Sequence, residues 1–126
     1  MKGSWHIVAY SSTVERYISC LNQGIKSGDF LYTLALMAED ATLTWDAPDH
    51  LGGKRNYSSR KEIVDFYSLL GQPHMSDVEI VITRLEEHDD RVSASGQFKS
   101  LFNVMETSMT FHFDEHDRIV SLYIKV

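Results

Sequence analysis

A chain of 126 residues is long enough for one compact domain and short for two of ordinary size. Because 43% of its residues are hydrophobic and 24% are charged, the composition excludes a disordered chain, and a formal net charge of −6 disfavours nucleic acid and anionic lipid as partners. No run approaches the ~20 apolar residues that span a bilayer, and the single cysteine, Cys20, cannot form an internal disulfide, so we expect a cytoplasmic protein without a membrane partner.

The first part of the chain has the apolar spacing of helices. A capping-box pattern at Ser12–Glu15 is followed by apolar residues three and four apart, which predicts a helix over about residues 12–26. Ser27-Gly28-Asp29 ends it, and the spacing of apolar residues from Phe30 to Ala38 predicts a second, shorter helix. Residues 40–45 then read as a short strand. A further capping box at Ser59–Glu62 opens a third helix, which ends at Gly71.

The period changes from helical to alternating after the third helix. Apolar and polar residues alternate in four runs, which are Asp77–Glu87, Val92–Lys99, Met105–Phe113 and Ile119–Val126. A polar turn separates the first run from the second, and another separates the third from the fourth. Helices followed by antiparallel strands predict an α+β fold, with helices covering one face of a curved sheet.

The apolar face of this sheet carries two small residues, Ala94 and Gly96, among large neighbours such as Phe98, Met109 and Phe111. Two interpretations remain open. The missing volume leaves room for a flat apolar ligand, or the helices approach the sheet more closely at these positions.

Four segments, in this order along the chain, resemble the nuclear transport factor 2-like superfamily, which includes SnoaL-like polyketide cyclases and ketosteroid isomerases. They are "VERYISCLN" (Val14–Asn22), "GD...LALMAEDATL" (Gly28–Leu43), "GKRNYSSRKEIVDFY" (Gly53–Tyr67) and "FHFDEHDRIVSL" (Phe111–Leu122). The resemblance covers nearly the whole chain. It implies a single domain with a cone-shaped fold, in which three N-terminal helices pack on a curved, mainly antiparallel sheet with a short first strand.

The ketosteroid isomerases of this superfamily supply a template for a catalytic site. Tyr17 and Tyr67 match the tyrosines that donate to, or support, the oxyanion. Met109 falls where the template has a protonated acid, and a thioether cannot donate. When this chain is aligned with the template without a gap, the position of the general base falls on Trp45. When one inserted residue is allowed, it falls on Asp46. The resemblance therefore implies Asp46, Tyr17 and Tyr67 as catalytic residues of an isomerase or cyclase acting on a small hydrophobic carbonyl compound.

The alternation of a strand prevents Trp45 and Asp46 from both pointing into the pocket. If Leu43 faces inward, Trp45 does too, and only a bulge near Pro48 would turn Asp46 inward. Asp46, Asp49 and His50 are metal-ligand types, but they are too few for a calcium or zinc site, so we expect no metal and no cofactor.

A pocket is expected between the helices and the sheet, and its predicted lining comprises Trp45, Phe66, Ala94, Gly96, Phe98, Met109, Phe111 and Leu122. His74 precedes the sheet and is a candidate for one rim of the cone. An enzyme with Asp46 as base, a non-catalytic module that binds a small hydrophobic molecule, and a homodimer that associates through its sheet all remain open.

Overall fold

The computed structural model describes the backbone of residues 2–126 and the side chains from Tyr10 onward. Within this range the chain forms three α-helices, two 3-10 turns and one six-stranded sheet. The elements are α1 (Lys2–Ser27), α2 (Leu31–Ala35), β1 (Met37–Asp46), η1 (Asp49–Leu51), β2 (Lys54–Ser58), α3 (Arg60–Leu70), η2 (Pro73–Met75), β3 (Glu79–Glu87), β4 (Arg91–Lys99), β5 (Val104–Phe113) and β6 (Ile119–Lys125).

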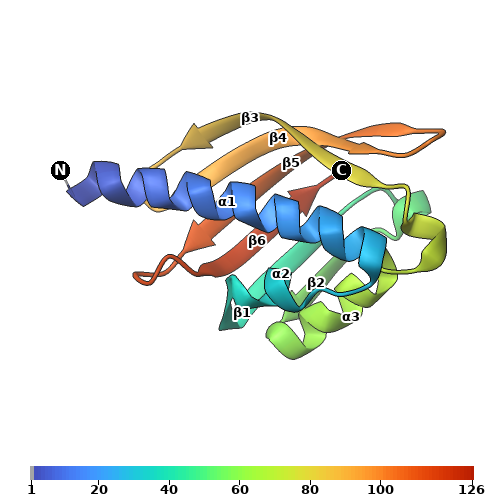
Figure 1. Ribbon diagram of the computed structural model, residues 1–126, viewed down its shortest axis with the longest axis horizontal. Helices are drawn as coiled ribbons and strands as arrows, with labels where there is room; N and C mark the ends of the chain where they lie inside the picture. The colour runs from blue at the N-terminus through green and yellow to red at the C-terminus, as the bar shows by residue number, and fades with distance from the viewer. Residues whose placement is uncertain (1) are drawn as a thin grey trace.

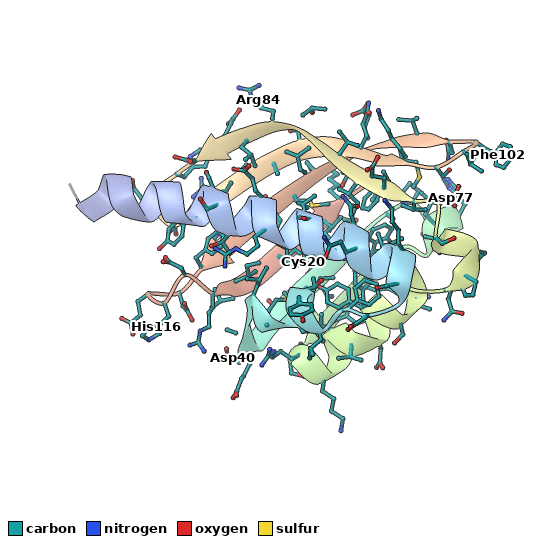
Figure 2. All side chains as sticks on the ribbon, in the orientation of Figure 1. Cys20, Asp40, Asp77, Arg84, Phe102 and His116 are labelled. Carbon is teal, nitrogen blue, oxygen red and sulfur yellow. The ribbon has the colours of Figure 1, made fainter. Side chains whose placement is uncertain are left out.

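The sheet has the strand order β2-β1-β6-β5-β4-β3, and β1 and β6 are its one parallel pair. Figure 1 shows α1 lying along one face of the curved sheet, with α2 and α3 gathered at the end where α1 finishes. The β4–β5 turn projects from the same end of the molecule and carries Phe102, which is 94% exposed (Figure 2). The predicted α+β class with a curved, mainly antiparallel sheet is confirmed.

The core lies between α1 and the inner face of the sheet. Val14, Tyr17 and Leu21 of α1 are buried at helical spacing, and they pack with buried residues of alternating parity from the strands, including Val92 and Phe111. Strands β3 to β6 begin and end within about two residues of the predicted runs. Hydrophobic alternation was a sufficient signal for these four strands.

The helical part of the chain differs from the sequence prediction in three places. Helix α1 begins at Lys2, so Ser12–Glu15 lies inside a continuous helix and does not cap it. Helix α2 ends at Ala35 because the chain at Met37 already pairs with Ile119 of β6, and this pairing makes β1 ten residues long rather than short. Pairing between distant segments has overridden local helical spacing.

Strand β2 was not predicted. It forms an antiparallel hairpin with β1, and the turn passes through Gly52 and Gly53, both at positive φ. Its sequence, Lys54–Ser58, contains one large apolar residue, Tyr57, so it has no hydrophobic alternation from which a strand could be predicted.

The neighbouring strand β3 takes the space that a side chain at Gly96 would occupy. A β-bulge in β3 between Ile82 and Arg84 brings the Val81 carbonyl over Gly96, so closely that a Cβ atom there would overlap the carbonyl oxygen. Gly96 therefore allows β3 to curl over β4.

Candidate functional site

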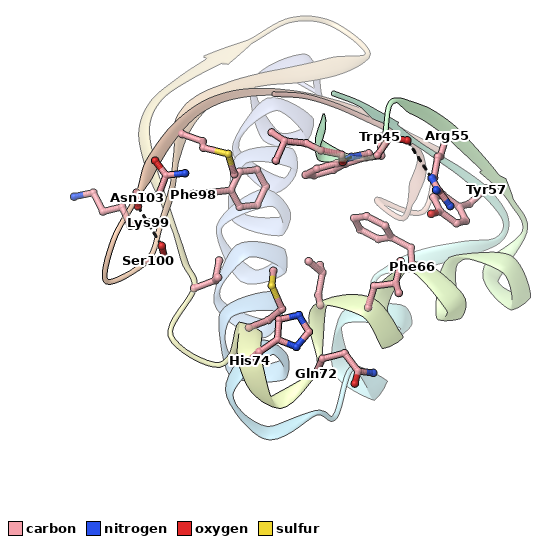
Figure 3. Close-up of a pocket in the computed structure, with 17 residues that line it drawn as sticks. Trp45, Arg55, Tyr57, Phe66, Gln72, His74, Phe98, Lys99, Ser100 and Asn103 are labelled. Carbon is pink, nitrogen blue, oxygen red and sulfur yellow. Dashed lines mark hydrogen bonds between the residues drawn. The ribbon is translucent and has the colours of Figure 1, made fainter. Parts of the chain in front are cut away.

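A pocket of about 520 Å³ opens at the end of the molecule where α3 and η2 face the ends of the strands (Figure 3). Its wall is formed by the β1–β2 hairpin, α3, η2 and the β4–β5 turn with the strand ends beside it. The lining residues are Trp45, Leu51, Gly52, Arg55, Tyr57, Phe66, Leu69, Leu70, Gln72, His74, Met75, Val78, Phe98, Lys99, Ser100, Asn103 and Met105. The size falls within the range of roughly 300–1,000 Å³ that is typical of small-molecule sites.

Aromatic rings form one continuous wall of the pocket. The ring centroid of Trp45 lies 5.8 Å from that of Phe66 and 5.9 Å from that of Phe98, and Tyr57 lies 5.4 Å from Phe66. The indole nitrogen of Trp45 donates a hydrogen bond to the Leu51 carbonyl oxygen at 3.2 Å. Because this bond satisfies the only polar atom of the indole, the ring presents apolar surface to the pocket.

The rim of the pocket is polar and carries positive charge. Arg55 extends from β2, Lys99 from the end of β4 and His74 from η2, and Figure 3 shows them on different sides of the opening. The Arg55 Nε donates to the Gly52 carbonyl oxygen at 3.3 Å. Among the side chains that the structure describes, no aspartate or glutamate lines the pocket.

Three of the predicted lining residues, Trp45, Phe66 and Phe98, line the pocket. The other five are buried deeper, between α1 and the sheet, and do not reach it; they are Ala94, Gly96, Met109, Phe111 and Leu122. The reason is that α1 fills this part of the cone, where the Tyr17 ring packs edge-on against Phe111 at 5.5 Å.

Asp46 lies on the opposite face of the sheet from Trp45. The pairing of β1 with β6 is regular from Thr42 to Asp46, so no bulge turns the carboxylate inward. The Asp46 carboxylate accepts a hydrogen bond from the Tyr123 hydroxyl on the outer face, and this bond is the main cause that raises the pKa of Tyr123. Asp46 is not among the residues that line the pocket.

Tyr17 and Tyr67 do come together, as the resemblance implied, but inside the core. Their hydroxyl oxygens are 2.5 Å apart, both side chains are at most 1% exposed, and the Tyr67 hydroxyl also lies 3.4 Å from the Met37 sulfur. Burial raises the pKa of both phenols well above the ordinary value. Neither residue lines the aromatic pocket, so this pair and Asp46 do not share a cavity. The catalytic roles of the three residues remain predictions.

The pocket residues that were not predicted include Arg55 and Tyr57 on β2 and Asn103 at the β4–β5 turn. The glycine pair at positions 52 and 53 was the available signal for a hairpin after β1. Such a hairpin sets Arg55 opposite Trp45 and therefore on the same face. His74 lines the pocket, at the rim where the sequence suggested it.

Within the described side chains, no three histidine, cysteine, aspartate or glutamate residues come together in a way that could hold a metal ion. Cys20 is half-buried on α1 (Figure 2). No described helix has both the length and the apolar character needed to cross a bilayer.

Solved structures with the same fold are numerous, although no protein-family model and no curated protein matches this sequence. Bal32a, from a soil-derived mobile gene cassette, is 18% identical with a TM-score of 0.74 over 94% of this chain and 89% of that one. An NTF2-like protein from Anabaena variabilis is 16% identical with a TM-score of 0.74, over 92% of this chain and 87% of its own. A SnoaL-like protein of unknown function from Burkholderia thailandensis is 13% identical, with a TM-score of 0.72 over 93% of each chain. The chain thus has the nuclear transport factor 2-like fold, shared with SnoaL-like proteins, as its sequence resemblance indicated.

Proposed function

We propose that this protein binds a small, mainly apolar, flat molecule in the pocket beside Trp45, and that it acts as a binding module rather than as an acid–base enzyme. The observation that carries the proposal is the aromatic wall of Trp45, Phe66 and Phe98 around a pocket of about 520 Å³. The Trp45 ring is tilted by 46° against Phe66 and lies edge-on to Phe98, so neither of these neighbours stacks on its face, and that face can take a flat ligand.

The arrangement of the acidic residues favours binding over catalysis. Proton transfer needs a base within hydrogen-bonding reach of the substrate, about 3 Å. Asp46 accepts a hydrogen bond from Tyr123 on the other side of the sheet, and the described lining contains no carboxylate. The tyrosine pair that could stabilise an oxyanion is enclosed in the core. A carbonyl compound in the pocket would therefore meet none of the three residues that an isomerase or cyclase mechanism requires.

Calorimetric titration with 2-acetylnaphthalene, a flat neutral ketone, tests the proposal. We expect saturable binding with one site per chain, and Trp45→Ala should weaken it about tenfold because the ligand loses its largest stacking partner. Tyr32→Ala removes an aromatic side chain that is 70% exposed on α2 and does not line the pocket, so it should leave the affinity unchanged. No binding to the wild type, or equal losses in the two variants, would contradict the proposal.

The same ketone distinguishes the binding module from the enzyme. Its methyl protons exchange with deuterium when a base removes one of them, and nuclear magnetic resonance follows the loss of signal. We expect the wild type and Asp46→Asn to exchange the protons no faster than buffer does. An acceleration by the wild type that Asp46→Asn abolishes would instead establish an acid–base enzyme with Asp46 as its base.

A further inference from the structure

The rim of the pocket has the opposite charge balance from the chain as a whole. The protein has 18 acidic and 12 basic residues, whereas the described lining contains Arg55 and Lys99 and no acidic residue. A small ligand at the pocket mouth therefore meets fixed positive charge close by, while the acidic residues lie elsewhere on the described surface.

Arg55 is placed to meet a ligand that rests on the aromatic wall. It is the cross-strand partner of Trp45 in the β1–β2 hairpin, so the two side chains leave the sheet side by side on its inner face. The Gly52 carbonyl accepts from Nε and steadies the side chain, and no described carboxylate forms an ion pair with the guanidinium. Its two terminal nitrogens are left as a planar fork of donors, which is the geometry that matches a carboxylate.

Tyr57 follows Arg55 on the same face of β2, two residues along the strand. Its ring packs against Phe66, and its hydroxyl makes no hydrogen bond with any described residue. The indole N–H of Trp45, by contrast, is already bonded to Leu51. The polar groups available to a ligand therefore lie at the rim, and the interior of the pocket supplies apolar contact.

From this arrangement we infer that the natural occupant is an aromatic or similarly flat carboxylate, whose apolar body lies against Trp45 and whose carboxylate is held by Arg55. This inference rests on the proposed binding function and adds the class of ligand. The orientation follows from the geometry, because the apolar body fits the aromatic wall, and of the two charged lining residues, Arg55 and Lys99, it is Arg55 that is the cross-strand neighbour of Trp45.

A matched pair of ligands tests the inference by calorimetry. 2-Naphthoate and 2-acetylnaphthalene have the same ring system and nearly the same shape, but only the first is an anion at pH 7. We expect 2-naphthoate to bind about fivefold more tightly than the ketone, which is the scale of a partly exposed pair of charges. Equal or weaker binding of 2-naphthoate would contradict the inference and leave the binding function intact. Failure of both ligands to bind would contradict both.

Two variants, each of which removes one positive charge, test whether Arg55 itself causes the preference for 2-naphthoate. Arg55→Gln should abolish the preference for 2-naphthoate while the affinity for the ketone stays within about twofold. Lys54→Gln removes a positive charge from the adjacent residue, which lies opposite Asp46 in the β1–β2 register and does not line the pocket, so it should preserve the preference. If Lys54→Gln lowers naphthoate affinity as much as Arg55→Gln does, the net charge of the region and not a directed contact is responsible, and the inference is wrong.

Discussion

The phenols of Tyr17 and Tyr67 satisfy one another in the core, which makes each sensitive to the loss of the other. Tyr17→Phe would leave the Tyr67 hydroxyl buried, with only the Met37 sulfur near it, and we expect it to lower the free energy of unfolding by about 1–3 kcal/mol. Urea unfolding monitored by circular dichroism measures this change. Tyr32→Phe, at an exposed tyrosine, is the control and should change stability by less than about 0.5 kcal/mol.

The double variant Tyr17→Phe/Tyr67→Phe tests whether the two hydroxyls stabilise the fold as a hydrogen-bonded pair or independently of one another. Replacing both residues by phenylalanine removes both polar groups together, so its cost should be smaller than the sum of the single variants. Additive losses would show that the two hydroxyls do not depend on one another.

The same pair makes stability depend on pH in the alkaline range. Burial raises the pKa of both phenols in the folded state above the unfolded value of about 10, so the folded chain holds its protons more tightly than the unfolded chain does. Their contribution is complete below pH 10 and is lost as the pH rises above that value toward the folded pKa. Urea unfolding at successive pH values should show this decline, and the double phenylalanine variant should show a shallower one.

At Trp45 and Asp46, adjacent side chains lie on opposite faces of one strand. The alternation of β1 and the burial of Leu43 were sufficient to predict that Trp45 faces inward if no bulge intervenes. The sequence could not exclude a bulge, because bulges depend on the pairing partner, and β6 lies more than seventy residues away. The rim residues Arg55 and Lys99 could not be predicted for a similar reason, since their positions depend on how the β1–β2 hairpin and the β4–β5 turn are placed across the pocket.

Among the elements, the contact of β3 with β4 depends on the absence of a side chain at Gly96. Gly96→Ala would place a methyl group against the Val81 carbonyl and within about 3.1 Å of the Ile82 Cα atom, and both are backbone atoms that can move only if the bulge shifts. We expect a loss of about 2 kcal/mol or more in thermal or urea unfolding. Ser95→Ala, at the neighbouring exposed position, should be nearly neutral, and similar losses in both variants would contradict the role assigned to Gly96.

Prediction succeeded for elements whose apolar pattern matched their final environment. Strands β4, β5 and β6 each bury one face, and β3 packs Ile80, Ile82 and Leu85 against the core, so their alternation is visible in the sequence. Strand β2 lies at the edge of the sheet and is mostly exposed, so it carries no such pattern. Met37 and Ala38 continue the helical spacing that begins at Phe30, yet they belong to β1, and Met37 pairs with Ile119 of β6. A local pattern cannot reveal a partner so distant in the chain.

For the whole molecule, the resemblance predicts a homodimer that associates through its sheet, and because α1 covers the inner face, we expect the outer face to meet the partner. The middle of this face is polar but half-buried, with Ser93, Thr110 and Tyr123 in one register across β4, β5 and β6. Sedimentation equilibrium should give a mass twice the 14.4 kDa of one chain. Thr110→Arg, which introduces a long charged side chain in the middle of the face, should produce monomers, whereas a monomeric wild type would contradict the prediction.

The contacts of Trp45 also give the molecule a spectroscopic use. The chain has two tryptophans, Trp5 and Trp45, so a Trp5→Phe variant would emit from the pocket wall alone. The indole is half-buried in the pocket wall and fixed by Leu51, so an occupant would displace water from the indole face without changing the hydrogen bond of the indole. A shift of the emission to shorter wavelength would then report the filling of the pocket, in a chain that carries no added label.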